Sequence, residues 1–183
     1  MKSNLQIISG KYRGKKLSLP VDARPTQNMA RGALFNMLNG VLDTSKSLTV
    51  WDVFAGSGAF GLECISRFNN SNVIFTDNAK SSIDTIKKNL NSIKENATIE
   101  IGDAISVISK FGATADLVFV DPPYADFGLG LLFVKKLGKI AKSGAILIWE
   151  FEKTQETPRI DDNWEVLKDK TYGRARFLFL IKK

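Results

Sequence analysis

The sequence predicts an α/β fold: a mostly parallel sheet with helices on both faces, a C-terminal antiparallel hairpin, and a small N-terminal β-hairpin and helix. Three observations lead to this prediction. From residue 48 onward, short apolar runs alternate with longer amphipathic segments, as expected for parallel strands joined by helical crossovers. A glycine-rich turn follows the first run. The last two apolar runs flank Tyr172-Gly173, which favours a hairpin.

Residues 1–47 are predicted to form a basic extension. Short apolar runs at 5–9 and 16–20 flank a segment with glycine at both ends, which is typical of a hairpin. Thr26 is a candidate N-cap for a helix with apolar spacing up to Val41. The extension holds eight lysines and arginines against two aspartates, whereas the rest of the chain holds 18 basic and 17 acidic residues. This excess indicates either a polyanionic partner or a solvated basic arm.

Residues 48–183 are expected to form the main domain. In chain order we expect a strand at 48–54, a helix to 67, a strand at 72–77, a helix at 79–93, a strand at 97–101, a helix at 104–110, a strand at 116–120, a helix at 127–141, a strand at 145–151, a loop at 152–163, and a final hairpin of 164–168 and 175–182. These assignments rest on apolar spacing and on glycine and proline positions.

The composition excludes several classes of chemistry. The chain has no histidine, which removes serine–histidine and cysteine–histidine catalysis. A single cysteine, Cys64, excludes an internal disulfide and a multi-cysteine zinc site, so no metal site is expected. No apolar run is long enough for a transmembrane helix, and the N-terminus does not resemble a signal peptide. We therefore expect a cytoplasmic protein without a membrane partner. We also expect a monomer.

The glycine turn lies where the first strand passes into the first helix. It reads Asp52-Val53-Phe54-Ala55-Gly56-Ser57-Gly58 and continues to Gly61, which allows a tight turn and close helix packing. The spacing also matches the dinucleotide fingerprint, a weak signal by itself. Asp77, after the second strand, could accept the hydroxyls of a ribose, and Asp103, after the third, could accept an adenine amino group.

This predicted pocket lacks features that bind phosphate. Asp52 would repel a pyrophosphate but attract an ammonium group, and the chain has no phosphate-binding P-loop sequence. A nucleoside that carries an amino acid and a positive charge fits better, which predicts S-adenosylmethionine. The candidate cofactor-binding residues are Asp52, Phe54, Ala55, Gly56, Ser57, Gly58, Asp77, Asn78, Asp103 and Ala104.

A second motif, Asp121-Pro122-Pro123-Tyr124, follows the buried strand at 116–120. Ligands bind at the carboxyl ends of such strands. The two prolines stiffen the turn and leave its carbonyls available as acceptors, while the tyrosine offers a flat aromatic face. These four candidate catalytic residues could grip a planar group that carries an NH₂.

Together, the glycine turn, Asp77, Asp103 and the proline motif resemble the Rossmann-like methyltransferases that modify exocyclic amines of nucleic-acid bases. The N-terminal part resembles the RsmD-type 16S rRNA guanine-N2 methyltransferases of bacteria. This resemblance rests on four segments: Ile8 to Leu17, Arg24-Pro25-Thr26, Arg31, and Leu34-Phe35-Asn36. The resemblance covers nearly the whole chain and weakens at 152–170. Gly32 and Asn28 depart from the acidic residues usual in that family.

The resemblance implies methylation of a guanine N2 amine in 16S rRNA, alone or within a 30S subunit, with S-adenosylmethionine as cofactor. The implied RNA-binding residues are Lys11, Tyr12, Arg13, Lys15, Lys16, Arg24 and Arg31. Tyr12 could instead pack against the protein. Three alternatives stay open: a methyltransferase acting on adenine N6, cytosine N4 or a protein glutamine, a dinucleotide-dependent oxidoreductase, and a non-catalytic RNA-binding module.

Overall fold

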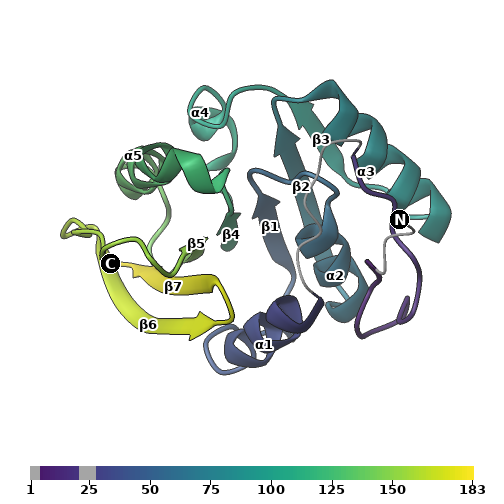
Figure 1. Ribbon diagram of the computed structural model, residues 1–183, viewed down its shortest axis with the longest axis horizontal. Coiled ribbons are helices and arrows are strands. Elements are labelled where there is room, and N and C mark those ends of the chain that lie inside the picture. Colours follow the sequence, from purple (N-terminus) through teal and green to yellow (C-terminus); the bar gives the residue numbers. More distant parts are fainter. Residues whose placement is uncertain (1–4, 21–27) are drawn as a thin grey trace.

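A computed structural model describes residues 5–20 and 28–183 (Figure 1). Its sheet has seven strands in the order β3-β2-β1-β4-β5-β7-β6. The strands are β1 (Leu48–Asp52), β2 (Ser71–Asp77), β3 (Thr98–Ile101), β4 (Leu117–Val120), β5 (Ile146–Glu152), β6 (Trp164–Tyr172) and β7 (Ala175–Lys182). The pairings β1–β2, β2–β3, β1–β4 and β4–β5 are parallel, whereas β7 pairs antiparallel with both β5 and β6. The predicted fold class is confirmed.

Helices cover both faces of the sheet (Figure 1). They are α1 (Asn28–Leu38), α2 (Ala59–Arg67), α3 (Lys80–Ile93), α4 (Ile108–Phe111) and α5 (Phe127–Gly138), with a 3₁₀ turn η1 (Tyr124–Asp126) before α5. One hydrophobic cluster joins α1, α2 and α3 to one face of the strands, and a second joins α4 and α5 to the other. On β4, Leu117 and Phe119 belong to the first cluster, and Val118 and Val120 to the second. This alternation explains why the strand is apolar at every position.

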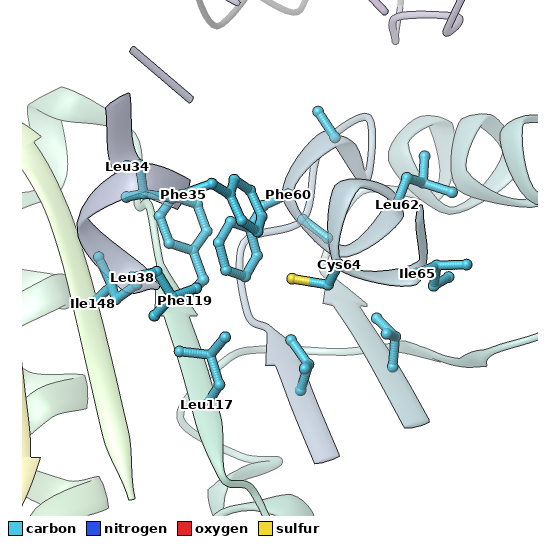
Figure 2. Close-up of a cluster of buried hydrophobic side chains, with 14 of the residues drawn as sticks. Leu34, Phe35, Leu38, Phe60, Leu62, Cys64, Ile65, Leu117, Phe119 and Ile148 are labelled. Atoms are coloured by element: carbon cyan, nitrogen blue, oxygen red, sulfur yellow. The ribbon is translucent and has the colours of Figure 1, made fainter. Parts of the chain in front are cut away.

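The N-terminal extension shares the core of the sheet. Leu5, Ile7 and Leu17 belong to the same buried cluster as α1 and α2. The ring of Phe60 stacks on Phe35 of α1 with centroids 5.3 Å apart and on Phe119 of β4 at 4.1 Å (Figure 2). The described part of the extension is therefore packed onto the main domain rather than built around its own core. None of the helices in the described ranges is long and apolar enough to cross a membrane.

The expected N-terminal hairpin is present as an irregular one, with an antiparallel bridge between Gln6 and Lys16. The Ile7 amide donates to the Lys15 carbonyl at 3.0 Å, and the Leu17 amide donates to the Leu5 carbonyl at 2.9 Å. Beyond Ile7 the pairing ends, and the amides of Ile8 and Ser9 donate to the Glu63 carboxylate at 2.8 and 2.9 Å. The expected cap, Thr26, lies outside the described residues.

Several element boundaries differ from the prediction. The fourth helix begins at Ile108 rather than at 104, because the amides of Ile105 and Ser106 turn back to the Asp103 carboxylate. Strand β6 continues to Tyr172 rather than ending at 168. Its second half is polar because it is an edge strand, and charged side chains are common on such edges.

Gly61 sets the distance between α2 and β2. A Cβ atom at this position would lie 2.3 Å from Phe75 Cε1 and 2.9 Å from Val73 Cγ1. A side chain would therefore push α2 away from the sheet, and the glycine turn that precedes the helix would move with it. The role expected for Gly61, close helix packing, is confirmed.

We predict that Gly61→Ala lowers the free energy of unfolding by about 1–3 kcal/mol, the usual cost of overpacking a core. The matched control is Gly128→Ala in α5, where an added Cβ has no heavy atom within 4 Å. The control should leave stability unchanged or raise it slightly, because alanine favours helix. Urea unfolding of both variants measures the difference, and equal stability would contradict the packing role.

Candidate active site

A cavity of about 760 Å³ opens at the carboxyl edge of the parallel strands. It lies where the chain leaves β1 on one side and leaves β4 on the other, the position at which open α/β sheets bind ligands. The strand ends and their following turns supply most of its wall, and α1, the start of α2, α5, β5, the β6–β7 hairpin and Leu19 supply the rest. The predicted site residues found in this wall are Asp52, Phe54, Ala55, Gly56, Ser57, Asp77, Asn78, Asp103, Ala104, Asp121, Pro122, Pro123 and Arg31.

Two carboxylates hold the glycine turn in shape. Asp77 accepts hydrogen bonds from the Gly56 amide at 2.8 Å and the Ala79 amide at 2.9 Å. Asp52 accepts from the Gly61 amide at 3.0 Å. The turn needs glycine because Gly56 and Gly58 have φ angles of +54° and +75°. The same acids that were predicted to bind a ligand therefore also fix the backbone around it.

Asp52 is almost fully enclosed, with 2% of its surface exposed. Burial raises the pKa of its carboxyl well above the usual range, and the nearby Asp121 and Asp77 raise it further, although the Gly61 hydrogen bond opposes the shift. A cationic group beside Asp52 would relieve this cost. The arrangement favours a ligand that carries positive charge.

Asp103, after β3, also lines the cavity. Its Oδ1 accepts from the amides of Ile105 and Ser106 at 2.9 and 3.0 Å, so it caps a turn, the alternative reading of an acid at this position. A carboxylate offers about four acceptor sites, which leaves capacity for a ligand donor. Gly58 does not line the cavity: a Cβ there would meet Ile86 and Phe75 in the core, each at 3.2 Å.

The proline motif follows β4 directly. Asp121 and Pro122 line the cavity, and burial raises the pKa of the Asp121 carboxyl to about 7. The Pro123 carbonyl accepts from the Asp126 amide at 2.7 Å, so it is committed to η1 and was wrongly expected to be free. The side chain of Tyr124 lies outside the described part of the structure. The motif thus places a partly buried carboxyl beside the glycine turn.

Most of the described cations of the extension are at the surface. Lys11, Arg13, Lys15 and Lys16 are exposed. Lys11 Nζ and the Tyr12 hydroxyl both bind the Glu95 carboxylate, at 2.7 and 2.5 Å. The Tyr12 ring packs against the core cluster, which favours its packing role over base stacking. Arg24 lies outside the described residues.

The expectation that Arg31 binds RNA at the surface is wrong. Only 4% of its surface is exposed, so it cannot belong to an exposed phosphate-binding surface. Its guanidinium lies 3.6 Å from the Glu63 carboxylate and donates to the Gln6 carbonyl at 2.5 Å. Burial lowers the pKa of Arg31, and Glu63 opposes that shift. Arg31 instead forms part of the cavity wall next to α1.

Sequence reasoning missed Glu63, which joins the extension to α2. Its buried carboxylate accepts from the Ile8 and Ser9 amides and from Arg67 Nε at 2.7 Å, besides the Arg31 ion pair. Removing one partner of such a buried cluster typically costs several kcal/mol. The available signal was a lone acid inside the apolar run Phe60-Gly61-Leu62-Glu63-Cys64-Ile65.

The cavity wall contains further residues that the sequence did not indicate. They come from the C-terminal part of the sheet, and they are Glu150, Tyr172, Arg174 and Phe177. Strand pairing brings them there, and no local pattern marks them. At Gly32, where the resemblance led us to expect an acidic residue, an added Cβ would meet only Ile8 Cδ1 within 4 Å, so packing does not require glycine.

Comparisons with known proteins agree with this architecture. The family model described as "Conserved hypothetical protein 95" matches residues 5–181. The chain belongs to this family. It is 35% identical over 182 residues to "Ribosomal RNA small subunit methyltransferase D" of Escherichia coli (strain K12), covering 94% of this chain and 87% of the relative. The protein of the same name from Haemophilus influenzae is 33% identical, covering 94% and 91%.

Solved methyltransferase structures have the same fold as this chain. The "Putative methyltransferase yhhF from Escherichia coli" superposes with a TM-score of 0.82 and 30% identity, covering 97% of each chain. The rRNA methyltransferase aviRa from Streptomyces viridochromogenes shares the fold with a TM-score of 0.71 at 13% identity, covering 91% of this chain and 88% of that one. The resemblance to RsmD-type enzymes is confirmed, and the fold is that of Rossmann-like methyltransferases.

We predict that the Asp121 carboxyl titrates near pH 7, as its raised pKa implies. An unfolded aspartate titrates near 3.9, so folding binds a proton between these values. The stability contributed by this carboxyl is therefore fully present below about pH 4 and is lost as the pH rises through 7. Carboxyl-selective NMR of the wild type measures the titration, and Asp121→Asn should remove it. A resonance that titrates near pH 4 would contradict the prediction.

Proposed function

We propose that this protein is an S-adenosylmethionine-dependent methyltransferase that modifies the N2 amine of a guanine in 16S rRNA. The observation that supports it most is the placement of Asp121 in the same cavity as Asp52, Asp77 and Asp103. The three acids after β1, β2 and β3 suit a cationic nucleoside, and Asp121 after β4 offers an acceptor for an amine. The names of the E. coli and H. influenzae relatives, small-subunit rRNA methyltransferases, support the choice of RNA.

The residues of the cavity fit this cofactor. Asp77 would accept from the ribose hydroxyls, Asp103 from the adenine amine, and Asp52 would stand next to the cationic end. The glycine turn, with a positive φ at Gly56, allows close approach of a ligand. When bound, S-adenosylmethionine supplies an electrophilic methyl group on a positively charged sulfonium.

The proline motif prepares the acceptor amine. The lone pair of the guanine NH₂ is delocalised into the ring. The Asp121 carboxylate and the Pro122 carbonyl would accept hydrogen bonds from its two N–H groups and draw the lone pair out of conjugation. Correct alignment of two reacting groups supplies about 7–11 kcal/mol of a barrier. Once it has gained the methyl group, the nitrogen would be cationic and would release its proton to solvent, so a chain without histidine can perform the step.

Tyr124 would stack on the target base, a contact typically worth about 1–3 kcal/mol. The base must be unpaired or flipped out to reach Asp121 at the strand end. The exposed cations Lys11, Arg13, Lys15 and Lys16, together with Arg24, would hold RNA phosphates. We propose 16S rRNA, free or within a 30S subunit or assembly intermediate, as the partner of a monomeric, cytoplasmic enzyme.

We predict that Asp121→Ala abolishes methyl transfer while S-adenosylmethionine binding stays within about threefold of the wild type. Asp77→Ala should instead weaken S-adenosylmethionine binding, because Asp77 holds the glycine turn. Calorimetry measures binding, and mass mapping of 16S rRNA from a deletion strain, treated with each variant, measures transfer. Lost cofactor affinity with residual turnover in Asp121→Ala would contradict the assigned role, as would methylation of a base other than guanine.

The basic extension is best tested by substitution, because Leu5, Ile7 and Leu17 are buried and a deletion would disturb the core. We predict that Arg13→Ala with Lys15→Ala weakens binding to 16S rRNA and lowers the salt slope by about two, one for each phosphate contact. The control is Lys135→Ala with Lys136→Ala, exposed near the end of α5. Filter binding across a salt series measures the slope, and an unchanged slope would identify a solvated arm.

A further inference from the structure

We propose that the tip of the β6–β7 hairpin, defined as Tyr172, Gly173 and Arg174, is a second RNA-binding surface on the cavity rim. Its occupant would be the single-stranded nucleotides next to the target base. This proposal rests on the proposed function, because it requires the substrate to be a base within an RNA strand.

Strand pairing places the tip at the active-site edge of the sheet. β7 is antiparallel to β5 and begins at Ala175, opposite Glu152 at the carboxyl end of β5. That end lies at the same edge as the carboxyl ends of β1 and β4, because β5 is parallel to β4 and β4 to β1. The turn before Ala175 must therefore reach the cavity, and Tyr172 and Arg174 both line it.

The rest of the hairpin is fixed against the body of the protein. Lys168 of β6 donates to the Met37 carbonyl at the end of α1 at 2.8 Å, and β6 runs past α1 (Figure 1). A bulge between Val166 and Lys168 interrupts the register of β6. Bulges bend a strand and re-aim its side chains, often beside active sites. The tip is thus held at the rim by contacts that lie outside the tip itself.

The exposed side chains of the tip suit a single strand of RNA. Tyr172 is 36% exposed although it is aromatic, and the Arg174 side chain is 74% exposed. Exposed aromatic rings stack on unpaired bases with little sequence preference, and the guanidinium of arginine matches the geometry of a phosphate. The side chains of one tip could therefore contact a base and its phosphate together.

The charge around the tip also favours a polyanion. Residues 152–153 and 169–176 carry four cations, Lys153, Lys170, Arg174 and Arg176, against the two carboxylates Glu152 and Asp169. Arg174 forms an ion pair with Glu152 at 2.7 Å. Such exposed pairs contribute little to stability, so a phosphate can replace the carboxylate at small cost. The cavity would then have a cationic contact on the side of the hairpin.

The test compares RNA binding and turnover of Tyr172→Ala and Arg174→Ala with the wild type, on 16S rRNA transcripts and on 30S subunits from a strain that lacks the enzyme. Tyr172→Ala should raise KM for RNA about tenfold with kcat within about twofold, and Tyr172→Phe should restore it. Arg174→Ala should lower the salt slope by about one, and Arg174→Lys should retain it. S-adenosylmethionine affinity should stay unchanged in all four.

The matched control is Lys110→Ala. Its side chain is 55% exposed and forms a similar surface ion pair with Glu100 of β3, and neither residue lines the cavity or belongs to the basic extension. It should leave KM and the salt slope unchanged. Thermal unfolding checks that the variants fold. Because the Arg174 side chain is exposed, Arg174→Glu should also fold, and its negative charge should weaken RNA binding further than Arg174→Ala does.

Wild-type methylation of guanine N2 combined with unchanged RNA binding in both tip variants would overturn the hairpin proposal and leave the proposed function intact. Absence of guanine N2 methylation by the wild type would overturn the proposed function. RNA binding by the wild type that weakens in the tip variants would then still support the tip as an RNA contact.

Discussion

The position of β1 between β2 and β4 is the constraint on which the rest of the structure depends. Asp52, the last residue of β1, lies opposite Phe75 of β2 and Phe119 of β4 in two parallel pairings. From there the chain proceeds outward to one side through β2 and β3, and then returns to β4 on the other. The crossovers leave the strand ends open between them, which creates the cavity without any special loop.

Buried and half-buried carboxylates then fix the walls of that cavity. Asp52 and the half-buried Asp77 hold the glycine turn by backbone hydrogen bonds, and Glu63 binds the extension and Arg31 to α2. A buried carboxylate is costly unless it is well partnered, so Asp52 and Glu63 each favour one arrangement of the surrounding backbone. The apolar contacts of Phe60 with Phe35 and Phe119 support the same arrangement from the core side (Figure 2).

The proposed chemistry uses these constraints rather than a reactive side chain. The cavity combines acids for a cationic nucleoside with a raised-pKa carboxyl at Asp121, and the chain contains no histidine. An amine that needs alignment more than deprotonation suits such a site. The hairpin tip would add an RNA contact at the rim of the cavity, whereas Lys11 of the extension lies near Ser47 and Asn70, at the amino ends of β1 and β2.

The sequence by itself determined the order of strands and helices along the chain, the glycine turn and the acids at the strand ends. These features depend on apolar periodicity and local turn chemistry, which involve residues close together in the sequence. Only the tertiary structure decided which charged residues are buried and which distant ones meet. Arg31 looked like a surface cation until Glu63 proved to be its buried partner. Tyr172 and Arg174 lay in a polar stretch without a local signal, and they reach the cavity because β7 pairs with β5. Burial and strand register are properties of contacts between distant segments, so no local pattern encodes them.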